Sequence, residues 1–184
     1  MRDAADLARF VAGRPTMLAR LATVAAHGPP GAWIGAGFLR NAVWDALSGR
    51  EPEAIPPADL DVVFHDAADA SAARDAAAEA ALGLAAPGLP WSVTNQARMH
   101  ARNGHAPYRD VADALAHWPE TATAIAARLG PAGVEILAPH GLADLFALLA
   151  RPTPAHRADP AAMLARIAAK GWRTRWPGLQ VLAR

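Results

Sequence analysis

The sequence has no cysteine, which excludes disulfide bonds, thiolate nucleophiles and zinc sites built on cysteine. It also lacks any run of about 18 uncharged apolar residues, the length needed to cross a membrane. The first ten residues mix charged and apolar side chains and do not form the apolar stretch of a secretory signal. We therefore expect a soluble, cytoplasmic protein with no membrane partner.

The chain also has no large excess of either charge. It contains 18 Lys and Arg residues and 17 Asp and Glu residues, which gives a formal net charge of +1. Such a chain has no overall field that attracts nucleic acid, so any contact of that kind would need a local patch. With 184 residues, 53% of them hydrophobic, the chain can bury a substantial core. We expect one domain over residues 1–184, with helices in residues 1–26 and a C-terminal helix and tail, residues 155–184, packed on the core.

Hydrophobic spacing divides the chain into helices and strands. Two short helices are expected before residue 28, and residues 91–95 should form a strand antiparallel to that at residues 59–65. The alanine-rich helix that begins at residue 70 should end at Gly83. The other expected helices are residues 38–47, 96–102, 108–117, 120–129, 142–149 and 160–170. The other expected strands are residues 32–36 and 134–137.

Two aspartates, Asp59 and Asp61, lie two residues apart on the expected strand at residues 59–65. Successive side chains of a strand alternate between its faces, so both carboxylates project on one side while Leu60 points into the core. Carboxylates placed side by side repel each other, a cost that is easier to understand if a cation lies between them. Ligation by oxygen alone favours Mg²⁺ or Mn²⁺. The alternative is a solvent-facing strand end that binds nothing.

Two glycines, Gly35 and Gly37, flank Ala36 where the expected strand turns into a helix. Backbone amides could approach a phosphate there without obstruction, and a helix N-terminus offers partial positive charge. Arg40, one turn into the helix, could add donors for phosphate oxygens. The alternative is a tight strand-to-helix connection without a ligand.

Residues 35–41 (Gly-Ala-Gly-Phe-Leu-Arg-Asn), followed by Asp-Leu-Asp at residues 59–61, resemble the polymerase-beta-type nucleotidyltransferase superfamily. Further segments fall in the order seen in the head domain of CCA-adding and poly(A) polymerases. More closely, residues 20–180 resemble a bacterial family of nucleotidyltransferase-like proteins with the signatures Asn-Gln-Ala-Arg-Met-His and Trp-Pro-Glu-Thr. The resemblance implies an α/β nucleotidyltransferase fold, in which a small mixed sheet has helices packed on one face and helical additions at both ends.

The resemblance also implies an activity. The protein would move a nucleoside monophosphate from a nucleoside triphosphate to a hydroxyl of an unknown acceptor, which could be a small molecule, a protein or an RNA end. Metal ions held by Asp59 and Asp61 would bridge the triphosphate and the incoming hydroxyl. The residues expected to contact the nucleotide are Gly35, Gly37, Arg40, Asn41, Arg98, Glu120 and Thr121, although Thr121 also fits a simple helix start.

The superfamily has a third carboxylate on the neighbouring strand, and here the matching position is expected to be Asn95. An amide oxygen is neutral, so it coordinates Mg²⁺ weakly and cannot act as a base. Another group such as Glu120, Glu135 or His100 could supply the charge, or the substrate could bring its own activated nucleophile. A second hypothesis is therefore a catalytically impaired nucleotide-binding or sensor protein.

Several other residues allow simpler roles. Trp172 and Trp176, with arginines between them, could bind nucleic acid or dock the last helix on the core, and we favour docking. Asp66 is expected to cap the following helix. Asp144 and Arg151 could pair with each other or support the site.

Overall fold

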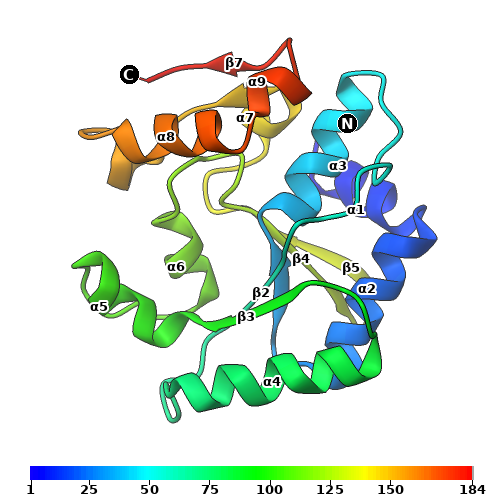
Figure 1. Ribbon diagram of the computed structural model, residues 1–184, viewed down its shortest axis with the longest axis vertical. Coiled ribbons are helices and arrows are strands. Elements are labelled where there is room, and N and C mark those ends of the chain that lie inside the picture. The colour runs from blue at the N-terminus through cyan, green and yellow to red at the C-terminus, as the bar shows by residue number, and fades with distance from the viewer. Residues whose placement is uncertain (184) are drawn as a thin grey trace.

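The computed structural model describes residues 1–183, and Arg184, the last residue of the predicted tail, lies outside the described residues. Its helices and strands are arranged around one mixed sheet (Figure 1). The helices are α1 (Ala4–Ala12), α2 (Pro15–His27), α3 (Gly37–Leu47), α4 (Ala72–Ala85), α5 (Met99–Asn103), α6 (Val111–Ala116), α7 (Ala143–Phe146), α8 (Ala161–Ala169) and α9 (Trp172–Arg175), with 3₁₀ turns η1 (Gln96–Arg98) and η2 (Pro154–His156). The strands are β1 (Trp33–Gly35), β2 (Leu60–Phe64), β3 (Trp91–Asn95), β4 (Ala126–Gly130), β5 (Gly133–Leu137), β6 (Leu149–Ala150) and β7 (Gln180–Val181).

The main sheet has five strands in the order β3-β2-β1-β4-β5. Strand β1 runs antiparallel to β2 and β4, and β4 runs antiparallel to β5. The small mixed sheet is thus confirmed. The expectation that residues 91–95 run antiparallel to their neighbour is wrong, because β2 and β3 are parallel. Helix α4 lies between these two strands in the chain and forms the crossover connection that a parallel pair needs.

Two of the elements expected from the sequence differ in the structure, one in its type and one in where it ends. The alanine-rich residues 120–129 were expected to be helical, but they form a turn followed by β4, which pairs with β1 and β5. Ala124, Ile125 and Ala126 are fully buried. Burial against the neighbouring strands therefore outweighs the intrinsic helix propensity of this segment. Helix α4 continues through Gly83 to Ala85, because Gly83 faces open space and tolerates helical geometry.

Helices cover both faces of the sheet to different extents. On one face, α1 lies against β5, α2 against β4 and α4 against β3 (Figure 1). Leu60, Val62 and Phe64 of β2 point into this larger core. On the other face a smaller cluster joins Val63 of β2 to Leu115 of α6. None of the helices within residues 1–183 has the length and apolar character to cross a bilayer.

The C-terminal helices dock on α3, as favoured from the sequence. Trp172 and Trp176 are buried and make edge-on contacts with Trp44, with ring centroids 5.5 and 5.1 Å away. The buried carboxylate of Asp45 accepts hydrogen bonds from Trp176 Nε1 at 2.8 Å and from Arg175 Nη2 at 2.6 Å. Arg175 is therefore part of the docking contact, through its ion pair with Asp45. These contacts hold the C-terminal helices against the last turn of α3.

Candidate active site

The two aspartates predicted to share a strand face do face one cleft of about 320 Å³. Asp59 immediately precedes β2 and Asp61 lies within it, whereas Leu60 between them is fully buried on the opposite side. Burial of Asp61, and the nearby charge of Asp59, raise the pKa of the Asp61 carboxyl above its ordinary value. The Lys170 side chain partly opposes this shift. The pair is thus a site of concentrated negative charge.

The glycine turn contributes to this cleft through Gly37, whereas Gly35 does not line it. A Cβ atom added at Gly35 would lie 2.9 Å from Cη2 of Trp118, so this position must be glycine to accommodate the indole ring. Between the two glycines, Ala36 has φ 51° and ψ −119°, a conformation that is strained for a residue with a side chain. The turn directs the N-terminus of α3 toward the cleft, where its free amides favour an anion.

Arg40, one turn into α3, is buried beside the cleft with 3% of its surface exposed. Its Nη1 donates to Thr123 Oγ1 at 2.8 Å, its Nη2 donates to Asn41 Oδ1 at 2.9 Å, and its Cζ lies 4.0 Å from the ring centroid of Trp172. Burial lowers the pKa of Arg40 to about 10, an effect that the charge of Glu120 partly offsets. Arg40 is therefore fixed in place and positively charged at neutral pH.

The C-terminal helices supply the other cations of the cleft. Arg166 of α8, Lys170 at the end of α8, and Arg175 of α9 all line it. Lys170 Nζ lies 3.5 Å from Asp59 Oδ2. Arg166 and Lys170 were not expected at the site. Their spacing of four residues does place them on one face of a helix. We call this cleft, with Arg40, Arg166, Lys170 and Arg175 around the two aspartates, the cationic cleft.

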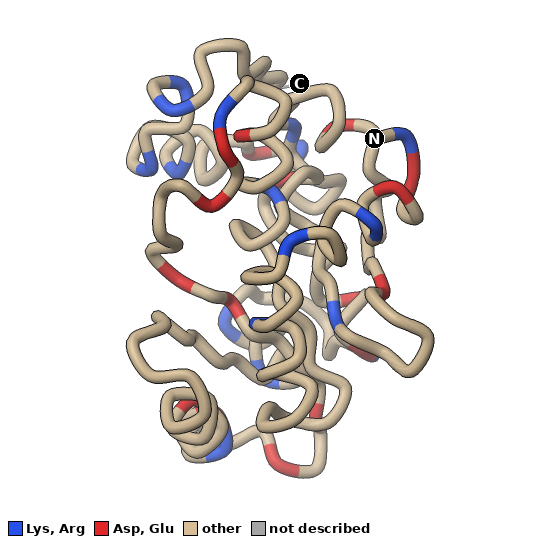
Figure 2. The backbone as a smooth tube through the Cα atoms, turned by 90° about the vertical axis from the view of Figure 1, so that its right-hand side faces the viewer, with Lys and Arg blue, Asp and Glu red and all other residues tan. Residues whose placement is uncertain are grey.

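The charged segments of the chain do not form one basic face. Figure 2 shows segments of both signs interspersed over the height of the molecule. This agrees with a formal net charge of +1 and leaves the cationic cleft as a local feature rather than part of a basic face. Arg166 and Arg175 are already paired with Glu120 and Asp45 outside the lining of the cleft. Arg40 and Lys170 beside the two carboxylates favour a negatively charged ligand that arrives with a divalent cation.

Glu120, predicted to contact nucleotide, lies behind the arginines and does not line the cationic cleft. Its carboxylate is fully buried, with Oε1 3.2 Å from Arg166 Nε, and Oε2 has no hydrogen-bond partner within residues 1–183. Thr121 also lies away from the cleft, because its hydroxyl donates to Asp144 Oδ2 at 2.7 Å. Arg151 pairs with Asp144 at 3.1 Å, one of the two roles expected for it.

The structure does not bring Asn95 to the aspartate pair. In the parallel register Asn95 lies beside Phe64, on the sheet face opposite Asp61, and the β3 residue beside Asp61 is Ser92. The Asn95 amide nitrogen donates to the carbonyl oxygens of Asp66 at 2.7 Å and Asp69 at 3.0 Å. Its amide oxygen accepts from the backbone nitrogens of Asp66 and Ala97, both at 3.0 Å. The expectation that Asn95 is the third ligand is corrected, since its amide is fully used in a structural role.

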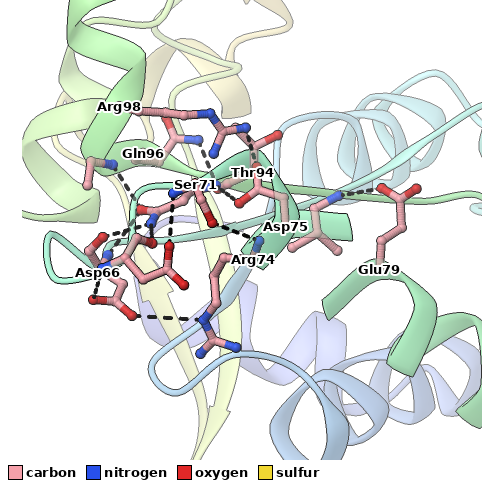
Figure 3. A network of polar contacts seen from close by, with 12 residues as sticks. Asp66, Ser71, Arg74, Asp75, Glu79, Thr94, Gln96 and Arg98 are labelled. Carbon is pink, nitrogen blue, oxygen red and sulfur yellow. Dashed lines mark hydrogen bonds and ion pairs between the residues drawn. The ribbon is translucent and has the colours of Figure 1, made fainter. Parts of the chain in front are cut away.

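The residues around Asn95 form a network of polar contacts (Figure 3). Arg98, expected to reach a phosphate, instead pairs with Asp75 of α4. Asp66 stabilises the turn before α4 by accepting from the Ala68 amide at 2.9 Å, whereas Ser71 caps the helix. The helix-capping role expected of Asp66 is therefore wrong. We call Asn95, Asp66, Asp69, Asp75 and Arg98 the Asn95 cluster.

The other two candidates for a third charge also lie elsewhere. Glu135 of β5 pairs with Arg128 of β4 at 2.6 Å, and His100 Nδ1 lies 2.8 Å from the carbonyl oxygen of Ala97. Neither lines the cationic cleft. Asp59 and Asp61 are consequently the two acids among its lining residues.

Two carboxylates are enough for a metal that is shared with a substrate. Within residues 1–183 no three His, Cys, Asp or Glu side chains come together to form a complete metal-binding group. Mg²⁺, however, is commonly held by one or two carboxylates and takes its remaining ligands from substrate phosphates and water. The pKa of Asp61 is raised by burial and then by the charge of Asp59, and a cation between the two carboxylates would relieve that repulsion.

Comparisons with known proteins agree with this geometry. A family model described as nucleotidyltransferase matches residues 22–181. An NMR structure reported to reveal a CCA-adding enzyme head domain is 29% identical, with a TM-score of 0.84, covering 99% of this chain and 97% of that one. The Thermotoga maritima CCA-adding enzyme complexed with tRNA is 17% identical with a TM-score of 0.56, and a CCA-adding enzyme complexed with ATP is 17% identical with a TM-score of 0.54.

Each of the last two comparisons covers 98% of this chain but 42% of the enzyme, so the chain spans less than half of their length. At that level of identity they show a shared fold. No match was found among curated proteins.

Proposed function

Because the chain belongs to the nucleotidyltransferase family, we propose that it is a metal-dependent enzyme that moves a nucleoside monophosphate from a nucleoside triphosphate to a hydroxyl of an acceptor. The observation that carries this proposal is the meeting of Asp59 and Asp61 with four cations and the N-terminus of α3 in one cleft. A triphosphate with its divalent cation has the charges that this arrangement complements.

The charged side chains of the cationic cleft have different roles in this proposal. Asp59 and Asp61 would hold Mg²⁺ or Mn²⁺, which when bound neutralises phosphate charge and helps to align the reacting oxygens. Arg40 is rigidly placed to bind a phosphate oxygen, and its Nε has no hydrogen-bond partner within residues 1–183. Lys170 is half exposed and can turn from Asp59 to the triphosphate. These cations would stabilise the charge that develops on the leaving pyrophosphate.

Asn41 and Gly37 complete the phosphate side of the proposed site. Both line the cationic cleft at the first turn of α3. Gly37 has no side chain to block a phosphate, and a Cβ there would lie 3.3 Å from Asn41 Nδ2. Glu120 acts through its neighbours, because it pairs with Arg166 and its charge supports that of Arg40. We therefore assign Glu120 a positioning role.

A second function, nucleotide binding without transfer, is favoured by one specific observation. The cationic cleft contains two acids, and the position beside Asp61 on β3 is Ser92. A protein that retained its phosphate-binding cations without a third carboxylate would act as a nucleotide sensor. Calorimetry that finds triphosphate binding without turnover would support this function.

The deciding experiment compares the parent protein with Asp61→Asn. Each of the four nucleoside triphosphates, labelled at the α-phosphate, is incubated with the protein, Mg²⁺ and a cell extract that provides acceptors. We expect labelled product from the parent and a loss of more than about 100-fold in Asp61→Asn, because even an outer-shell partner of a metal contributes about 10- to 100-fold. Failure of all four triphosphates to give product, or equal product from the variant, would contradict transfer.

A stability measurement shows whether the loss in Asp61→Asn is specific to the site. The raised pKa of Asp61 means that the folded protein binds its proton more tightly than the unfolded chain does. Stability from this group is thus present below its ordinary pKa of 3.8 and is lost as pH rises through the raised value. At neutral pH Asp61→Asn should unfold at a temperature equal to or above that of the parent.

A further inference from the structure

A second cleft, of about 170 Å³, also borders Asp61. Its walls come from β2 and β3 and from α5 and α6, which lie beside these strands in Figure 1. Asp61 is the one residue that lines both this cleft and the cationic cleft. A group bound in either cleft therefore borders the same carboxylate.

The chemistry of the second cleft differs from that of the first. No lysine, arginine or histidine lines it, and Asp61 is its single charged residue, so we call it the neutral cleft. Ser92 and Thr94 present hydroxyls that have no hydrogen-bond partner within residues 1–183. Tyr108 and Trp118 add aromatic surface. Aromatic walls with a few free polar groups are typical of sites for small molecules.

The placement of Trp118 connects this cleft to the glycine turn. The indole packs so closely on Gly35 that a Cβ there would lie 2.9 Å from its Cη2 atom. Gly35 thus shapes the wall of the neutral cleft, whereas Gly37 faces the cationic cleft. The turn therefore contacts both clefts, directly through Gly37 and indirectly through the packing of Gly35 on Trp118.

In phosphoryl transfer the attacking and leaving oxygens lie roughly in line on opposite sides of the phosphorus. If the charged tail of the triphosphate occupies the cationic cleft, the neutral cleft is a separate space beside the same Asp61 carboxylate in which the molecule that carries the attacking hydroxyl can bind. An RNA end would bring phosphates that need cations, and the neutral cleft offers none.

We propose that the neutral cleft is the acceptor site, and that the acceptor is a small, uncharged molecule with several hydroxyls, such as a monosaccharide or sugar alcohol. This inference rests on the proposed function. One acceptor hydroxyl forms a bond from its oxygen to the α-phosphorus, the bond from that phosphorus to the bridging oxygen of the β-phosphate breaks, and pyrophosphate leaves through the cationic cleft. The hydroxyl proton is released to water.

The test is a titration of the full chain with a panel of neutral monosaccharides and sugar alcohols, followed through backbone amide chemical shifts. We expect at least one compound to give saturable shifts at Ser92, Thr94 and Asn103. The variant Thr94→Arg, which narrows the neutral cleft and adds a cation, should weaken that binding by at least about tenfold. Absence of saturable shifts with the whole panel would overturn the assignment.

Milder variants guard against a failure of Thr94→Arg to fold. Ser92→Ala and Thr94→Val each remove one hydroxyl and should each weaken binding, whereas Thr23→Val, which removes a hydroxyl on the exposed surface of α2, should leave it unchanged. Equal binding by the parent and both cleft variants would also overturn the assignment. A short RNA with a free 3′-hydroxyl serves as the competing probe, and saturable shifts of the same amides by RNA would contradict a small neutral acceptor.

A transfer assay separates this inference from the proposed function. Transfer of label to a panel compound, lost in Thr94→Arg while triphosphate affinity is unchanged, supports both. Transfer to RNA but not to the panel overturns the acceptor assignment and leaves the nucleotidyltransferase intact. Panel binding without transfer from any triphosphate contradicts the proposed function, whereas the neutral cleft remains a binding site.

Discussion

Two polar clusters at opposite ends of β2 contain the same kinds of side chain but differ in how fully those side chains are satisfied. In the Asn95 cluster all four hydrogen-bonding positions of the Asn95 amide have partners, and Arg98 pairs with Asp75. Arg98 Nη1 has no partner within residues 1–183, so the contrast with the cationic cleft rests on Asn95 and Asp61 and not on the arginines. In the cationic cleft the Asp61 carboxylate receives no hydrogen bond within residues 1–183, and Arg40 Nε is also without a partner there.

The difference separates structural from ligand-binding polar groups. Buried polar groups in folded proteins almost always have partners, so a cluster that keeps its donors and acceptors free has capacity for something outside the chain. The pKa of Asp61 is raised by burial and by the charge of Asp59, and the nearby cations only partly oppose this shift. Disturbing the Asn95 cluster should therefore affect stability, and disturbing the cationic cleft should affect ligand binding.

The largest expected effect comes from Asn95→Asp. A carboxylate cannot donate to the carbonyl oxygens of Asp66 and Asp69, and it would be an unpaired negative charge in a fully buried position. We expect the free energy of unfolding to fall by about 3 kcal/mol, measured by urea denaturation. If Asn95 instead stood for the missing third carboxylate, the substitution would raise nucleotidyl transfer.

Asn103→Asp is the matched control for stability, because Asn103 is exposed. It makes the same chemical change without a comparable buried network, and it should change the unfolding free energy by less than about 0.5 kcal/mol. A gain of transfer activity in Asn95→Asp without loss of stability would remove the distinction between the two clusters.

Lys170→Met tests the cationic cleft with a smaller effect. Both Lys170 and Asp59 are more than 40% exposed in their side chains, so their ion pair adds little to stability. The lysine charge should matter for binding a triphosphate, and we expect the affinity, measured by calorimetry, to fall by about tenfold. The salt dependence of binding should also become shallower.

Arg173→Met is the control for this variant. Arg173 lies in the same C-terminal segment and is exposed, but it does not line the cationic cleft. Loss of its charge should leave triphosphate affinity within about twofold of the parent. Equal weakening by both variants would show that binding depends on the general charge of the segment and not on the cleft.

The sequence was sufficient for parts of the site that depend on local geometry. Alternation along β2 correctly placed Asp59 and Asp61 on one side, because the period of a strand is a local property. The face of Asn95 depended on the parallel register of β2 and β3, which arises from the α4 crossover. Arg166 and Lys170 follow Asp61 by more than 100 residues, and their place depends on the docking of Trp172 and Trp176. Such contacts between distant segments have no local sequence signal.

The smallest expected effect comes from Ala36→Gly, in the turn between the two clefts. Ala36 has a positive φ of 51°, and an alanine in such a conformation stores about 1 to 3 kcal/mol of strain. Glycine relieves this strain but adds about 0.5 to 1 kcal/mol of backbone entropy to the unfolded chain.

The net expectation for Ala36→Gly is a gain between about 0 and about 2.5 kcal/mol in the free energy of unfolding, centred on about 1 kcal/mol and measured by urea denaturation. Gly31→Ala is a suitable opposite control, because Gly31 has φ 70° in open space, so that the substitution adds strain without a steric clash. Gly31→Ala should lower the free energy of unfolding. If Ala36→Gly lowered it as well, the backbone at Ala36 would not be strained, and its conformation would have no special part in the glycine turn between the two clefts.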